Sequence, residues 1–329
     1  MSLSSRARQA LLLPAVLLPV LLLPDLVHSQ KNAAPSTASS KPEDLLKPRP
    51  RPKRPALPPS TLPLKFLPNE RIALVGNSTA ERMNLFGHFE TMLHARFPEQ
   101  KLIVRNFARP ADEVSIRQRP NDYTKLDDPL YAFGPDTFLC FFGCNESFAG
   151  PTGVEKFKRD YESFLDEYTK KYPRDDAGSL PRFLLISPIA FEPTGNPFLP
   201  DGTKENANLK LYAEAVKAVA EKRGLAFVDL FTPTLALFTE QPGMQYTING
   251  AHANEAGDQV IARALDQALF ASAWPSRLSS AEYEKLRAAV NDKSWTHMQD
   301  YRMVNGWYVY GGRRTWDHET FPREYLKIR

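Results

Sequence analysis

Short apolar runs alternate with longer amphipathic stretches through the middle of this chain. Continuous apolar runs of three to five residues are typical of strands that are buried on both faces of a parallel sheet. Five such runs occur, at residues 72–75, 102–104, 138–142, 183–186 and 226–228.

Between and after these runs, apolar residues recur with helical spacing. The stretches lie at residues 80–97, 154–172, 206–222 and 255–271. Alternation of strands and helices predicts a parallel sheet with helices on both faces. We therefore expect an α/β protein, a flavodoxin-like three-layer α/β/α sandwich with a five-stranded parallel sheet, and a ligand site outside the carboxyl ends of the strands.

The first 29 residues have the pattern of a secretory signal peptide. Two arginines precede an apolar segment at residues 11–23, and Ser29 is a suitable last residue before cleavage. This segment is shorter than the ~20 residues of a membrane span and contains two prolines, although an uncleaved anchor is the alternative. We expect a secreted or periplasmic protein with no stable membrane insertion after cleavage.

Residues 30–68 read as a linker, because ten of these 39 residues are proline and basic residues dominate the charged ones. The linker carries a net charge of +6 and residues 1–29 carry +1, so the chain's +4 leaves −3 for residues 69–329. A nucleic-acid-binding domain would concentrate basic charge on its folded part, so we expect no nucleic-acid partner. The linker is either a solvated spacer or a contact for anionic envelope polymers.

The folded domain is expected at residues 69–273, followed by a different region at residues 274–329. This last region starts with a short helical pattern at residues 281–290 and continues as an aromatic, basic tail. The alternatives for the tail are a lid, a partner-binding arm and a segment packed on the domain.

The chain has two cysteines, Cys140 and Cys144, and an extended backbone would hold them too far apart for a disulfide. We expect free thiols. Cysteine and histidine lack the spacing of metal ligands, and the first strand lacks the Gly-x-Gly-x-x-Gly pattern of dinucleotide sites, so we expect no metal and no cofactor.

Polar residues follow the first three predicted strands and precede the helix at residues 255–271. Ser78 follows the first strand at the start of a helix, where partial positive charge favours an alkoxide or a bound anion. Asn106 follows the second strand, Asn145 follows the third, and His252 precedes the helix. Each has an ordinary alternative, since serine at a strand–helix junction is usually an N-cap.

Four segments in this order resemble the SGNH/GDSL hydrolase family over about residues 70–272: Gly76-Asn77-Ser78, Asn106, Gly143-Cys144-Asn145 and Asn249-Gly250-Ala251-His252. The resemblance implies that Ser78 is a nucleophile and His252 a general base. It also implies an oxyanion hole formed by the Ser78 and Ala108 backbone N–H groups and the Asn145 side chain.

The chain departs from the family pattern at three positions. Asn77 and Asn249 stand where the family has Asp, and Ala108 stands where it has Gly. Asn249 is the expected partner of His252, as in an exported bacterial branch that has Asn-Gly-x-His. We expect support from Asn77 and Asn106, and Glu192 after the fourth strand is a further candidate.

These features predict a secreted serine esterase that cleaves small acyl esters, such as acetyl groups on carbohydrate, through an acyl-Ser78 intermediate. Because three polar positions are altered, the first alternative is a weakened or inactive module that binds carbohydrate or envelope components. The second is a structural envelope module that uses the linker and the tail as contacts.

Overall fold

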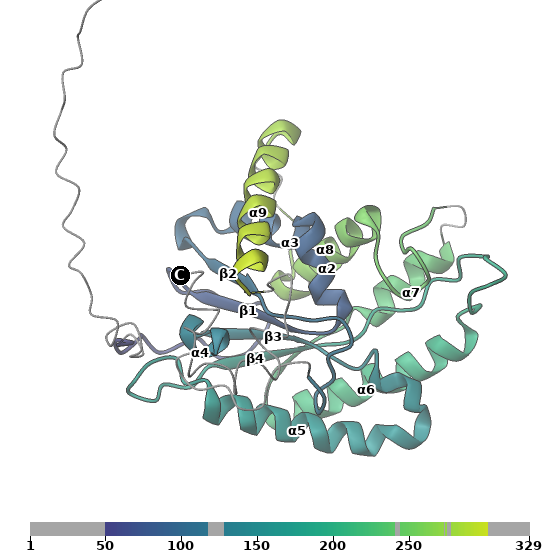
Figure 1. The fold of residues 1–329 in the computed structure, drawn as a ribbon, viewed down its shortest axis with the longest axis horizontal. Helices are drawn as coiled ribbons and strands as arrows, with labels where there is room; N and C mark the ends of the chain where they lie inside the picture. Colours follow the sequence, from purple (N-terminus) through teal and green to yellow (C-terminus); the bar gives the residue numbers. More distant parts are fainter. Residues whose placement is uncertain (1–49, 118–127, 241–243, 273, 275–277, 302–329) are drawn as a thin grey trace, which may run out of the picture. The chain divides into compact units, whose positions relative to one another are not determined.

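Five parallel strands form the centre of the structure, a computed structural model that describes residues 50–117, 128–240, 244–272, 274 and 278–301 (Figure 1). Their order in the sheet is β2-β1-β3-β4-β5, with every pair parallel. The strands are β1 (Arg71–Gly76), β2 (Ile103–Asn106), β3 (Thr137–Phe141), β4 (Arg182–Ile186) and β5 (Ala226–Val228). All five predicted strands are confirmed.

Helices cover both faces of the sheet (Figure 1). Because side chains alternate along a strand, Leu74 and Leu139 pack into one core with α2, α3 and α8, whereas Val75 and Cys140 pack into another with α5 and α6. The bounds are α2 (Ser78–Phe86), α3 (His88–Arg96), α5 (Val154–Lys171), α6 (Thr203–Arg223) and α8 (Glu255–Phe270). This arrangement confirms the three-layer α/β/α fold.

The first predicted helix, at residues 80–97, is in fact two helices. Gly87 ends α2 in a left-handed conformation with φ 72°, and its N–H donates to the Met83 carbonyl. A Cβ at this position would overlap the Asn291 side chain. The break therefore comes from a close approach that apolar periodicity does not record.

Shorter helical segments complete the described part. They are η1 (Pro98–Gln100), α4 (Pro129–Phe133), η2 (Glu146–Ala149), η3 (Pro151–Gly153) and α7 (Phe231–Glu240). Within the residues described, no helix combines the length and apolar character needed to cross a bilayer.

Helix α9 (Ser280–Tyr301) is longer than the expected helix at residues 281–290 and packs on the domain (Figure 1). Lys293 Nζ donates to Glu90 Oε2 of α3 (2.7 Å) and to the Val104 carbonyl (3.3 Å) of β2. Since β2 is an edge strand, Lys293 and Arg105, whose Nη1 donates to the same carbonyl (2.9 Å), together cover a group on the open edge of the sheet. The expected tail beyond this helix lies outside the described residues.

Residues 50–68, here called the strap, lie against the amino ends of the strands. Arg174 Nη2 donates to the Pro55 carbonyl (2.9 Å), Arg182 Nη2 donates to the Lys65 carbonyl (2.8 Å), and Leu64 is 3% exposed. The strap contains no helix or strand, as its composition predicts, but it is not a solvated spacer. The expected signal peptide and residues 30–49 of the expected linker lie outside the described residues.

Candidate active site

The turn between β1 and α2 places Ser78 at the first position of a helix. Gly76 has φ 128°, and a Cβ there would overlap the Phe141 carbonyl, so only glycine fits. Asn77 is the N-cap, and its Oδ1 accepts from the Thr79 N–H (3.0 Å). In the described part of the chain, neither the Ser78 hydroxyl nor its N–H has a hydrogen-bond partner, so both are available to a ligand.

The turn after β2 is organised by Asn106. Its Nδ2 donates to the Ala80 carbonyl of α2 (2.6 Å), and its Oδ1 accepts from the Ala108 N–H (3.0 Å). Asn106 therefore fixes the two turns together, which is a supporting role. The Ala108 N–H already donates to Asn106, so it could donate to a substrate oxygen only as a bond shared between the two acceptors. Ala108 is 1% exposed and belongs to the core that packs with α2 and α3.

The turn after β3 presents Asn145. Glu146 Oε2 accepts from the Gly143 N–H (2.9 Å), and Oε1 accepts from the Val114 N–H (3.0 Å), which joins this turn to the one after β2. Asn145 Nδ2 donates to the Asp112 carbonyl (3.1 Å), so one of its two N–H donors remains for a substrate oxygen. Burial raises the pKa of the Glu146 carboxyl to about 7, although hydrogen bonds from backbone N–H groups oppose the shift.

Residues 246–254, here called the His252 loop, form a closed turn before α8. Thr247 pairs with Ala253 as an antiparallel bridge, and the Ile248 N–H donates to the His252 carbonyl (2.8 Å). Gly250 has φ 88° and faces the Phe191 ring at a distance that leaves no room for a Cβ.

The residues that follow His252 form the start of α8. Asn254 is its N-cap and accepts from the Gly257 N–H (2.9 Å), while a Cβ on Gly257 would overlap the Tyr246 carbonyl. The Asn-Gly-x-His-x-Asn-x-x-Gly pattern is thus a description of one tightly built turn.

Asn249 fixes the orientation of the His252 ring. Its Oδ1 lies 2.9 Å from His252 Nδ1 and also accepts from the backbone N–H groups of Ala251 (3.3 Å) and His252 (3.1 Å). Backbone donors must face the oxygen of an amide and not its NH2 group. The Asn249 oxygen therefore faces Nδ1, so Nδ1 carries the proton and Nε2 keeps its lone pair.

The charge of His252 is set by burial and by two side chains of α2. Burial lowers the pKa of His252 from its usual value, Arg82 lowers it further, and Glu81 opposes them. The imidazole is therefore neutral at pH 7, as a proton acceptor must be.

Glu192 is not a substitute partner for His252. It is 4% exposed, and its carboxylate accepts from the Tyr246 N–H (2.8 Å) and from the N–H (2.7 Å) and hydroxyl (2.6 Å) of Thr247. The Glu192 N–H also donates to the Gly250 carbonyl (2.8 Å). Its support is indirect, because it anchors the His252 loop to the end of β4.

Two residues near His252 were not anticipated from the sequence. Arg82 Nε donates to the Ala253 carbonyl (2.8 Å), and Glu81 is a mostly buried carboxylate of the same helical turn. Their positions, three and four residues after Ser78, place them on its side of α2, and this spacing was the available signal. The Arg82 contact thus joins the helix that begins at Ser78 to the residue after His252, and the described residues show no direct hydrogen bond between Ser78 and His252.

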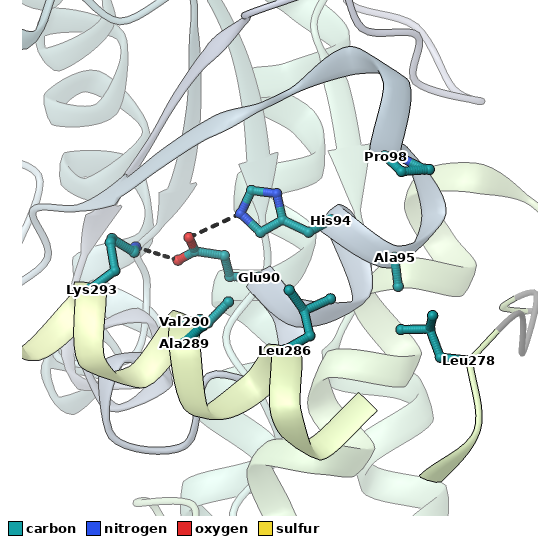
Figure 2. Close-up of a pocket in the computed structure, with 9 residues that line it drawn as sticks. All are labelled: Glu90, His94, Ala95, Pro98, Leu278, Leu286, Ala289, Val290 and Lys293. Carbon is teal, nitrogen blue, oxygen red and sulfur yellow. Dashed lines mark hydrogen bonds and ion pairs between the residues drawn. The ribbon is translucent and has the colours of Figure 1, made fainter. Parts of the chain in front are cut away.

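A groove of about 530 Å³ lies between α3 and α9, and none of its lining residues belongs to this site. Figure 2 shows the Glu90 carboxylate between His94 and Lys293 at one end, with apolar side chains beyond. Among the residues that the structure describes, no group of three or more His, Cys, Asp or Glu side chains could hold a metal ion. Cys140 and Cys144 are free thiols.

Comparisons with known proteins identify a family for this chain. A family model described as GDSL-like lipase/acylhydrolase matches residues 74–260. A search of curated proteins finds no match.

Solved structures of similar fold share little sequence with this chain. A gut microbial diltiazem-metabolizing enzyme has a TM-score of 0.50 at 18% identity over 62% of this chain and 48% of its own, about half its length. A protein described as a GDSL-like lipase from Parabacteroides merdae has a TM-score of 0.50 at 19% identity, over 64% of this chain and 99% of its own. A catalytic mutant of an acetylxylan esterase from Geobacillus stearothermophilus has a TM-score of 0.50 at 16% identity, over 65% of this chain and 100% of its own.

These likenesses concern the fold, whereas the family match spans more than half of the chain and includes Ser78, Asn106, Asn145 and His252. The chain belongs to the GDSL-like lipase/acylhydrolase family.

Proposed function

We propose that this protein is a serine ester hydrolase with an Asn249–His252–Ser78 triad. The observation that carries the proposal is the contact between Asn249 Oδ1 and His252 Nδ1, because it leaves Nε2 as a proton acceptor. An open serine at a helix N-terminus and a spare Asn145 donor complete the requirements for acyl transfer.

The reaction has two halves. His252 Nε2 takes the proton of Ser78 as the serine oxygen attacks the ester carbonyl carbon, and the Ser78 N–H and Asn145 Nδ2 stabilise the oxyanion. The carbon–oxygen bond to the alcohol then breaks, and His252 gives its proton to the leaving oxygen. In the second half, water loses a proton to His252, attacks the acyl-Ser78 carbonyl and releases the acid, and the serine oxygen regains the proton.

We propose a small acyl group, such as acetyl on a carbohydrate, as the substrate. Support comes from the fold shared with an acetylxylan esterase and from the signal-like residues 1–29, which favour a location outside the cytoplasm. The shared fold supports the reaction type more strongly than the alcohol, because these chains share little sequence.

The test is hydrolysis of p-nitrophenyl acetate by the chain from residue 30 onward and by its Ser78→Ala and His252→Ala variants. We expect both substitutions to reduce kcat/KM by at least ~10², and a fluorophosphonate probe to label Ser78. Ser163→Ala is the matched control, because Ser163 is an exposed serine of α5. A Ser78→Ala variant with the parental rate would refute the mechanism.

The substrate is tested separately by acetate release from acetylated xylan oligosaccharides. Hydrolysis of p-nitrophenyl acetate without acetate release would reject the carbohydrate ester and keep the esterase. Oligosaccharide binding that survives Ser78→Ala, together with equal background rates in all variants, would favour the non-catalytic binding module.

A further inference from the structure

A single side chain joins the helix of the nucleophile to the loop of the general base. Arg82 Nε donates to the Ala253 carbonyl at 2.8 Å, and Ala253 directly follows His252. Arg82 lies one helical turn after Ser78, on the same side of α2. Any change in the position of this arginine therefore moves the base relative to the nucleophile.

The same arginine lies within electrostatic range of His252. Its charge opposes protonation of the imidazole, and Glu81 on the same helix favours protonation. On the neighbouring elements, Asp258 of α8 interacts electrostatically with Arg82, and Glu255 of α8 and Arg287 of α9 interact with Asp258. Asn249 contributes no charge, so no carboxylate beside Nδ1 compensates for Arg82.

We propose that Arg82 is a positioning residue of this active site, which ties the His252 loop to the helix that carries Ser78 and holds a positive charge near the imidazole. The inference rests on the proposed function for its meaning in catalysis. Without a carboxylate beside Nδ1, the imidazolium that forms during the reaction is poorly stabilised. A neutral, fixed imidazole compensates in part, because His252 can still accept a proton at lower pH.

The main test is independent of catalysis. The titration of His252 is followed by nitrogen-15 NMR in the chain from residue 30 onward, and in its Arg82→Lys, Arg82→Gln and Arg82→Met variants. Removal of the charge in Arg82→Gln and Arg82→Met should move the midpoint to higher pH, whereas Arg82→Lys should stay near the parent. A purely structural role would not separate Lys from Gln.

The tie is tested by hydrogen exchange of the Ile248 N–H, which bonds to the His252 carbonyl. Exchange should be at least about tenfold faster in Arg82→Met, where the loop loses its contact with α2, and closer to the parent in Arg82→Gln, which keeps an N–H donor. Arg159→Met is the matched control, because Arg159 is an exposed arginine of α5.

Two results would overturn the inference. An unchanged His252 midpoint in both neutral variants would remove the electrostatic role, and unchanged Ile248 exchange in Arg82→Met would remove the tie. In the esterase assay we expect kcat to fall by about 10- to 100-fold in Arg82→Met, because a small displacement of the base is costly. If no Ser78-dependent hydrolysis exists, the proposed function fails while the two NMR measurements still decide the role of Arg82.

Discussion

At the scale of single residues, an amide oxygen stands beside His252 where the family has a carboxylate. In serine proteases, an Asn at the equivalent place lowers kcat by ~10⁴ because the histidine adopts the wrong tautomer. Here two backbone N–H donors direct the Asn249 oxygen toward His252 Nδ1, so Nδ1 carries the proton and only the negative charge of a carboxylate is missing.

We therefore expect Asn249→Asp to raise kcat/KM for p-nitrophenyl acetate by about 10- to 100-fold, less than the protease effect. The added carboxylate should also move the acidic limb of the pH–rate profile to higher pH, because it stabilises the imidazolium. Asn249→Leu, which removes the acceptor, should be slower than the parent. An Asp variant no faster than the parent would contradict this account.

The glycine of the His252 loop gives a second residue-scale prediction. We expect Gly250→Ala to lower the free energy of unfolding by about 2 kcal/mol or more, because it combines an unfavourable φ with an overlap with the Phe191 ring. Gly178→Ala is the matched control, since Gly178 has φ 81° but nothing within 4 Å of a Cβ. Equal losses in chemical denaturation would show that the ring contact does not matter.

The sequence allowed Ser78, Asn106, Asn145 and His252 to be predicted as one site, because the ends of parallel strands meet at one edge of a sheet. It did not reveal Arg82, whose partner lies 171 residues away. It also left the role of Glu192 open, since that depends on a loop whose path only the fold defines. Local sequence patterns do not predict contacts between segments that are distant in the chain.

At the scale of elements, the strands were predictable and the strap was not. A proline-rich segment has few side chains for a core, so composition alone indicates disorder. The strap is instead held through its backbone carbonyls, which accept from Arg174 and Arg182, and through Leu64. The two arginines belong to the domain, so nothing in the sequence of residues 50–68 predicts these hydrogen bonds.

We expect a chain that begins at residue 69 to have a free energy of unfolding lower by about 3 kcal/mol or more than a chain that begins at residue 50. Removal of the strap exposes the surface under Leu64 and leaves two largely buried guanidinium groups with fewer acceptors. Urea denaturation of both chains gives the comparison, and Ser60→Ala, which loses the bond to the Phe183 carbonyl, should show a smaller loss. Identical midpoints would mean that the strap only rests on the surface.

At the scale of the whole molecule, two buried carboxyls affect how stability depends on pH. Burial raises the pKa values of Glu146 and Asp258 to about 7. Their contribution to stability is complete below the pKa of the unfolded chain, near 4, and is lost as the pH rises through 7. Burial lowers the pKa values of His88, His252 and His297, which act in the opposite direction because their contribution is lost as the pH falls.

A comparison with Asp258→Asn isolates one of these groups. Asp258 is 2% exposed, so its ionised form is costly, and the variant has no ionised form. We expect the difference in Tm between the variant and the parent to shift in favour of the variant between pH 5 and pH 8. Melting curves over this range give the test, and parallel curves would show that Asp258 does not titrate there.

The anchoring of the His252 loop also has an evolutionary consequence. Glu192, Arg82 and Asn254 hold the loop through contacts that do not involve the charge at position 249. Natural selection can therefore exchange an amide for an acid at this position without rebuilding the turn. Under the proposed function, the strength of the base and the integrity of the fold depend on different contacts, and we expect one substitution to separate a slower enzyme from a faster one.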